Sequence, residues 1–155
     1  MAITLMMPSE SEMSIRTLNN VAVEYFELGL HNLSYQIWDE LYHKIQRNAK
    51  DYEALMPVIS CNMGNMLRQT GYYEEAWQVL IQGLKRCFGT GTFYGMPELI
   101  MQLSILRLKS GNVEAANSLY SFGKNIFLWS RQMQIDQPLE EVLERDFLLY
   151  CEETI

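Results

Sequence analysis

Three side-chain amides, Asn20, Asn62 and Gln102, recur along the chain at spacings of 42 and 40 residues. A carboxamide carries hydrogen-bond donors and an acceptor, so it can pair with the N–H and C=O groups of an extended peptide of any sequence. Arg16 and Arg68 precede or follow these amides closely and could take a terminal carboxylate through paired hydrogen bonds. The alternative interpretation is that the amides are helix-surface residues that stabilise their neighbours or contact solvent.

The same two spacings separate three glycines, Gly29, Gly71 and Gly111, each of which lies between two stretches with the apolar periodicity of a helix. Glycine lacks Cβ and suits the left-handed residue that ends a helix. Pro57 and Pro97 each lie 14 residues before their glycine, and proline is tolerated in the first helical turn. The first unit has no such proline. A fixed period in this range predicts a stacked repeat protein.

The sequence therefore predicts an all-α chain of about seven helices, because no stretch alternates as a strand does. We expect an α-solenoid of three helical hairpins, over about residues 13–48, 51–88 and 95–132, with a capping helix over 136–152. These residues belong to a single domain, 13–155, and residues 1–12 form a flexible leader.

The bulk composition excludes several classes of protein. A net charge of −7 argues against direct nucleic-acid binding, which relies on clustered Lys and Arg. The three cysteines are odd in number and form no CxxC, so we expect reduced thiols in a cytoplasmic protein. No stretch approaches the roughly 18 uncharged apolar residues of a membrane span, so we expect no membrane partner.

The reactive residue types do not form a catalytic or metal-binding pattern. His31 and His43 are 12 residues apart, and no Cys or carboxylate pair joins them at the spacing of metal ligands. Cys61 has no neighbouring His or Lys and is better read as a small apolar filler. We expect no enzyme activity, no metal and no cofactor. An apolar run at 127–129 could form a homodimer surface.

The second unit resembles a tetratricopeptide repeat, with Gly64 in its first helix, Gly71 and Tyr73 at the turn, and Ala76 and Gly83 beyond it. The third unit matches at equivalent positions, whereas the first has Ser34 where alanine is usual. The period of 40 to 42 residues exceeds the 34 of that repeat. Such elongated repeats are similar to the C-terminal sensor domain of Gram-positive peptide-sensing transcription regulators of the Rgg and PlcR type. The resemblance spans residues 13–150 and lacks their helix-turn-helix domain.

This resemblance implies a groove lined by the first helix of each hairpin. It assigns to that groove Arg16, Asn19, Asn20, Val23, Phe26, Cys61, Asn62, Asn65, Arg68, Met101, Gln102 and Ile105. The ligand would be a short peptide or protein segment, for which Phe26, Met101 and Ile105 would form apolar pockets. The implied function is the non-catalytic, ligand-sensing part of a bacterial transcription regulator, and the alternative is a constitutive scaffold or adaptor. We expect Asn62→Ala and Asn65→Ala to weaken peptide binding with little change in Tm.

Overall fold

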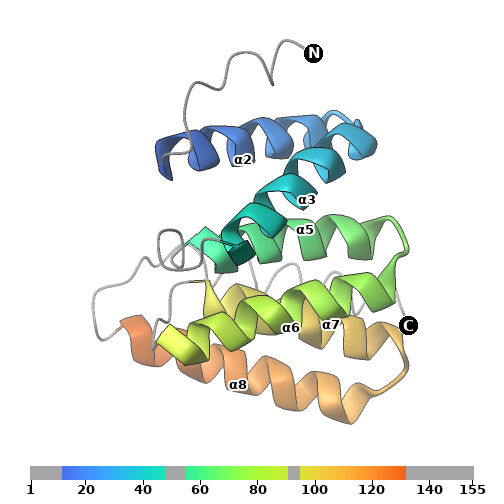
Figure 1. Ribbon diagram of the computed structural model, residues 1–155. Coiled ribbons are helices and arrows are strands. Elements are labelled where there is room, and N and C mark those ends of the chain that lie inside the picture. Colours follow the sequence, from blue (N-terminus) through green and yellow to red (C-terminus); the bar gives the residue numbers. More distant parts are fainter. Residues whose placement is uncertain (1–11, 48–54, 91–94, 132–155) are drawn as a thin grey trace.

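The computed structural model describes residues 12–47, 55–90 and 95–131 of the chain. Within these ranges it contains six α-helices and no strand, which confirms the predicted all-α class there (Figure 1). The helices are α2 (Glu12–Glu27), α3 (His31–Arg47), α5 (Met56–Gln69), α6 (Tyr73–Thr90), α7 (Met96–Lys109) and α8 (Val113–Arg131). The predicted leader up to residue 11, the connector at 91–94 and the predicted cap at 136–152 lie outside the described residues.

The three glycines adopt one common turn geometry between consecutive helices. Gly29, Gly71 and Gly111 have φ values of +80°, +91° and +85°, in the left-handed region that favours glycine. A backbone hydrogen bond closes each turn, from Leu30 N to Tyr25 O, from Tyr72 N to Leu67 O and from Asn112 N to Arg107 O, at 2.8, 2.8 and 3.0 Å. The prediction that these glycines end helices is confirmed.

The helix starts match the sequence-based expectation in two units and differ from it in the first. Pro57 and Pro97 lie in the first turn of α5 and α7, where the missing N–H has no intrahelical partner. In α3, neither Asn32 nor Ser34 is the residue that precedes the helix, because α3 begins at His31. Ser34 is instead buried one turn inside, and its hydroxyl donates to His31 O at 2.9 Å.

The helices pack as consecutive pairs, α2 with α3, α5 with α6 and α7 with α8. Neighbouring pairs are joined by contacts of α3 with α5 and of α6 with α7. Figure 1 shows the pairs following one another from α2 at the top to α8 at the bottom. The first helices also contact each other directly, α2 with α5 and α5 with α7, so they form one continuous layer.

Small residues at the crossings bring the helices of each pair close together. A Cβ on Gly64 would lie 2.5 Å from Leu80 Cγ, and a Cβ on Gly83 would lie 2.6 Å from Ser60 Cβ. Large apolar side chains fill the space around these contacts at the density usual in protein interiors. The largest fully buried ones include Trp38, Leu41, Ile59, Leu80 and Leu99.

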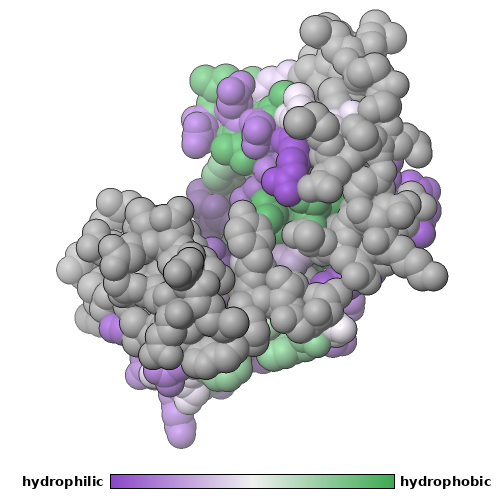
Figure 2. All heavy atoms as spheres, turned by 90° about the vertical axis from the view of Figure 1, so that its left-hand side faces the viewer, coloured by the Kyte–Doolittle hydropathy of each residue, from purple (hydrophilic) through white to green (hydrophobic). Residues whose placement is uncertain are grey.

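The outer surface of the helices mixes polar and apolar residues. On the face shown in Figure 2, hydrophobic residues lie beside hydrophilic ones where the chain is coloured. None of the described helices has both the length and the hydropathy that crossing a membrane requires.

Candidate functional site on the first-helix face

A cavity of about 270 Å³ opens between α2 and α5 on the face formed by the first helices. Ile15, Leu55 and Ile59 give it a buried apolar floor, and Arg16 and Asn20 are exposed at its rim. Asn19 and Val58 complete the lining. An apolar floor with a few convergent polar groups is the usual composition of a ligand pocket. Three of the twelve predicted groove residues, Arg16, Asn19 and Asn20, therefore border a real cavity.

Asn19 joins three helices through its carboxamide oxygen. Asn19 Oδ1 accepts hydrogen bonds from Trp38 Nε1 of α3 and from Asn62 Nδ2 of α5, each at 2.9 Å. Asn62 thus pairs with Asn19 and not with Asn20, the residue one period before it in the sequence. Asn20 is the amide that faces outward at the cavity rim.

Arg68 makes the corresponding link between α5 and α7. Its Nε donates to Gln102 Oε1 at 2.9 Å, and its Nη2 donates to Asn65 Oδ1 at 2.8 Å. Gln69 Nε2 also donates to Asn65 Oδ1, at 3.1 Å. A ligand carboxylate would have to compete with these amide oxygens for the Arg68 guanidinium, which weakens the case for Arg68 as its receptor.

The apolar residues assigned to the groove are more enclosed than the sequence analysis expected. Val23 and Phe26 are half-buried and pack against the core, and the Phe26 ring centroid lies 5.0 Å from that of His31. Met101 and Ile105 are only 5% and 2% exposed. A ligand could reach these last two only if the structure opened, so they do not form the open pockets that were expected.

Two thiols and one carboxyl lie close together where α5, α6 and α7 meet. Burial, with a smaller contribution from Glu98, raises the pKa of Cys61 to about 12 and that of Cys87 to about 11. Burial also raises the pKa of the Glu98 carboxyl, whose Oε2 is buried and has no hydrogen-bond partner. The thiols are therefore protonated and unreactive near neutral pH, in keeping with Cys61 as a small apolar side chain.

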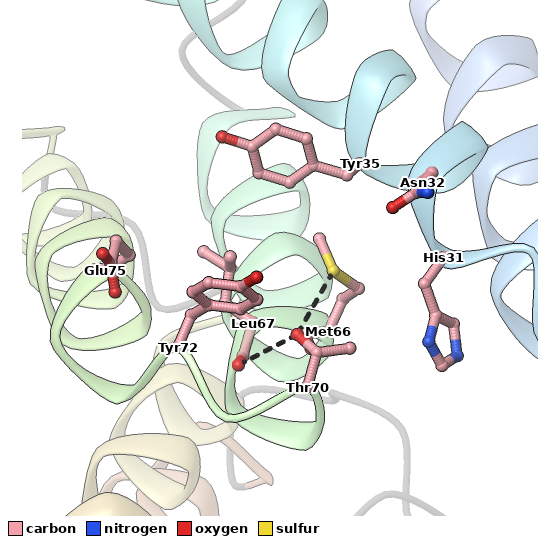
Figure 3. A pocket seen from close by; sticks show the side chains of 8 residues that line it. All are labelled: His31, Asn32, Tyr35, Met66, Leu67, Thr70, Tyr72 and Glu75. Atoms are coloured by element: carbon pink, nitrogen blue, oxygen red, sulfur yellow. Dashed lines mark hydrogen bonds between the residues drawn. The ribbon is translucent and has the colours of Figure 1, made fainter.

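A second cavity, of about 560 Å³, lies between α3, the end of α5 and the start of α6. Its eight lining residues are His31, Asn32, Tyr35, Met66, Leu67, Thr70, Tyr72 and Glu75 (Figure 3). None of them was among the predicted site residues. The signal that could have found it is the comparison of positions one period apart, because Tyr35 corresponds to Trp77 and both are aromatic.

The histidines do not take part in a metal centre within the described ranges. His43 Nδ1 lies 2.8 Å from Asp39 O, one turn earlier in α3. No group of three or more His, Cys, Asp or Glu residues there is arranged to hold a metal ion.

Comparisons with known proteins give no relative for this chain. No protein-family model, no curated protein sequence and no solved structure matches it. The likeness to tetratricopeptide repeats therefore rests on the residues and spacings of the chain itself.

Proposed function

We propose that this chain is a non-catalytic, tetratricopeptide-like domain that binds a short peptide or protein segment on the face formed by α2, α5 and α7. The observation that carries the proposal is the cavity between α2 and α5, with its apolar floor and its rim of Arg16 and Asn20. The identical turns at the three glycines and the direct contacts among the first helices support a stacked arrangement with these helices on its inner side.

The cavity can bind one residue of an extended ligand in two ways at once. Its volume of about 270 Å³ accepts an aliphatic side chain, and burying one stabilises a complex by about 1.5–3 kcal/mol. The exposed Asn20 amide can pair with the ligand backbone, which adds about 1 kcal/mol. Arg16 brings a positive charge to the same rim and can attract a ligand carboxylate.

The regulatory role that we propose is that of the ligand-sensing part of a bacterial transcription regulator. It rests on the likeness to the peptide-sensing regulators described above. A ligand between α2 and α5 would change the relative stability of two arrangements of these helices only if it contacted them differently in each. The Asn19–Asn62 bond spans these two helices and is the contact that such a change would break first.

One observation favours the alternative, a constitutive scaffold. The Asn19–Asn62 and Arg68–Gln102 hydrogen bonds hold α2, α5 and α7 in a fixed relation without a ligand. A face that is already formed needs no rearrangement to bind. Hydrogen–deuterium exchange distinguishes the two: a sensor changes protection in helices remote from the bound peptide, whereas a scaffold changes it only beneath the peptide.

Selection from a random peptide display library with the full chain tests the proposal. We expect selected peptides to bind the Asn20→Ala variant about fivefold more weakly, the loss of one hydrogen bond. Gln46→Ala, an exposed amide on α3 away from the cavity, is the matched control and should leave the affinity unchanged. Selected peptides that bind Asn20→Ala and Gln46→Ala equally well would contradict the site.

A further inference from the structure

The cavity between α3, α5 and α6 has aromatic walls and an apolar floor. Met66 and Leu67 form the floor and are 2% and 5% exposed. Tyr35 from α3 and Tyr72 from the turn lie across the cavity from each other, and Glu75 projects from α6 beside them (Figure 3). The two tyrosines are 40% and 58% exposed, so both rings can be reached from solvent. We call this the Tyr35 cavity.

The next junction along the chain shows what an equivalent aromatic ring binds. The turn glycines make residues 42 apart equivalent in the first two pairs and residues 40 apart equivalent in the last two, so Tyr35 corresponds to Trp77 and Leu67 to Arg107. At the second junction the Arg107 guanidinium carbon lies 4.0 Å from the Trp77 ring centroid. At the first junction Leu67 stands in place of that arginine, so the chain's own α5 brings no cation to Tyr35 from this position.

A second contact repeats this difference between the junctions. Lys109 Nζ lies 5.7 Å from the Tyr73 ring centroid at the second junction. The equivalent positions at the first junction hold Gln69 and His31, so a neutral amide replaces the lysine. Both cations that the end of α7 brings to α6 are therefore absent from the corresponding end of α5.

The Tyr35 cavity also carries a negative charge that the second junction lacks. Glu75 lines the cavity, whereas its equivalent one period later is Ala115. Burial, then Asp39, then Glu75 raise the pKa of Tyr35, which places both carboxylates within electrostatic reach of that ring. None of the eight lining residues is Lys or Arg.

We propose that the Tyr35 cavity binds an arginine side chain of a partner peptide or protein, with its guanidinium stacked on Tyr35 and paired with Glu75. The partner would thereby supply the cation that Arg107 supplies within the chain at the second junction. This site is separate from the cavity between α2 and α5, so each can fail without the other.

Arginine fits this cavity better than lysine. The guanidinium is planar and weakly hydrated, so it can stack on an aromatic face and donate to a carboxylate at the same time, whereas an ammonium is a strongly hydrated point charge. The methylene stem of the side chain can lie along Met66 and Leu67. The volume of about 560 Å³ leaves room for the backbone on either side of the arginine.

A nuclear magnetic resonance titration of the full chain tests the proposal. The probes are capped Gly-Arg-Gly and the same peptide with citrulline, which keeps the planar shape but has no charge. We expect the arginine peptide to shift the backbone amide resonances of Tyr35 and Glu75 in a saturable way, and to bind at least fivefold more tightly than the citrulline peptide. Tyr35→Leu and Glu75→Ala should each weaken binding roughly threefold to tenfold.

Glu114→Ala is the matched control, because it removes the same charge from the exposed first turn of α8. We expect it to leave the affinity unchanged. Equal binding of the arginine and citrulline peptides would overturn the proposal. Equal weakening by Glu75→Ala and Glu114→Ala would also overturn it, because the attraction would then be a property of the net charge. Far-UV circular dichroism of each variant checks that the helices are intact, and shifts confined to residues outside the cavity would count against the site.

Discussion

Asn62 Nδ2 of α5 donates a hydrogen bond of 2.9 Å to Asn19 Oδ1 of α2, which joins the first two helix pairs through their first helices. The same oxygen accepts from the indole N–H of Trp38, whose side chain is 1% exposed. One carboxamide oxygen therefore satisfies two donors from two other helices. Because a buried donor without an acceptor is costly, this contact contributes to stability as well as to the shape of the first-helix face.

Replacing Asn19 should destabilise the fold more than replacing Asn62. Asn19→Ala removes the acceptor of two donors and should lower the free energy of unfolding by about 2 kcal/mol, whereas Asn62→Ala removes one bond and should cost about 1 kcal/mol. Urea denaturation measures both, with Gln46→Ala as a surface control. This revises the expectation that Asn62→Ala leaves Tm nearly unchanged. An Asn19→Ala variant as stable as the wild type would contradict the role of the shared oxygen.

Gly64 should not tolerate even a methyl group. A Cβ there would lie 2.5 Å from Leu80 Cγ, and Leu80 is fully buried, so Gly64→Ala should cost about 1–3 kcal/mol through overpacking. A Cβ on Gly89, near the end of α6, would meet no atom within 4 Å. Gly89→Ala should therefore leave stability unchanged or raise it by about 0.5 kcal/mol. Thermal denaturation of the two variants compares them, and equal effects would show that the α5–α6 crossing is not tightly packed.

Glu98 should make stability depend on pH in a direction opposite to that of a salt-bridged carboxylate. Burial raises its pKa in the folded state above the unfolded value, so ionisation disfavours the folded state. The resulting loss of stability is absent below the unfolded pKa, grows as the pH rises, and is complete above the folded pKa.

Glu98→Gln removes this titration and should be about 1 kcal/mol more stable than the wild type at pH 7. The difference should shrink to near zero as the pH falls below the ordinary glutamate pKa. Urea denaturation at several pH values measures it, and Glu114→Gln on the exposed start of α8 is the control. A gain for Glu98→Gln that stayed constant with pH would show that ionisation of Glu98 does not cause it.

The native chain should protect Cys61 and Cys87 from alkylation. Their pKa values of about 12 and about 11 leave almost no thiolate at pH 8, and Cys87 is also fully buried. Iodoacetamide should modify both at least about a hundredfold more slowly than in urea, as followed by mass spectrometry of the separate peptides. Labelling of Cys61 at the same rate in native and unfolded protein would contradict its placement against the core.

The positions of the turns could be predicted from the sequence because their cause is local. A left-handed residue favours glycine and a first helical turn tolerates proline, so Gly71 and Pro57 marked a helix end and a helix start without knowledge of packing. The same argument failed at the start of α3, where Ser34 has a side chain able to cap but lies one turn inside the helix.

The contacts across helices could not be predicted in this way. Sequence period shows which residues are equivalent, and it grouped Asn20 with Asn62, but equivalent residues need not touch. Which side chains meet depends on how adjacent helices are rotated and offset, and this placed Asn62 against Asn19. Burial of Met101 and Ile105 likewise depends on neighbours that a single helix pattern does not reveal.

The central claim is that a peptide binds on the first-helix face at the cavity between α2 and α5. Methyl-resolved nuclear magnetic resonance of the full chain, titrated with a peptide selected as above, tests it most directly. We predict saturable shifts of the Ile15, Val58 and Ile59 methyl groups, which line that cavity, and none for Val113, which is exposed on α8. Saturable binding that leaves the Ile15, Val58 and Ile59 methyl groups unshifted would contradict the claim.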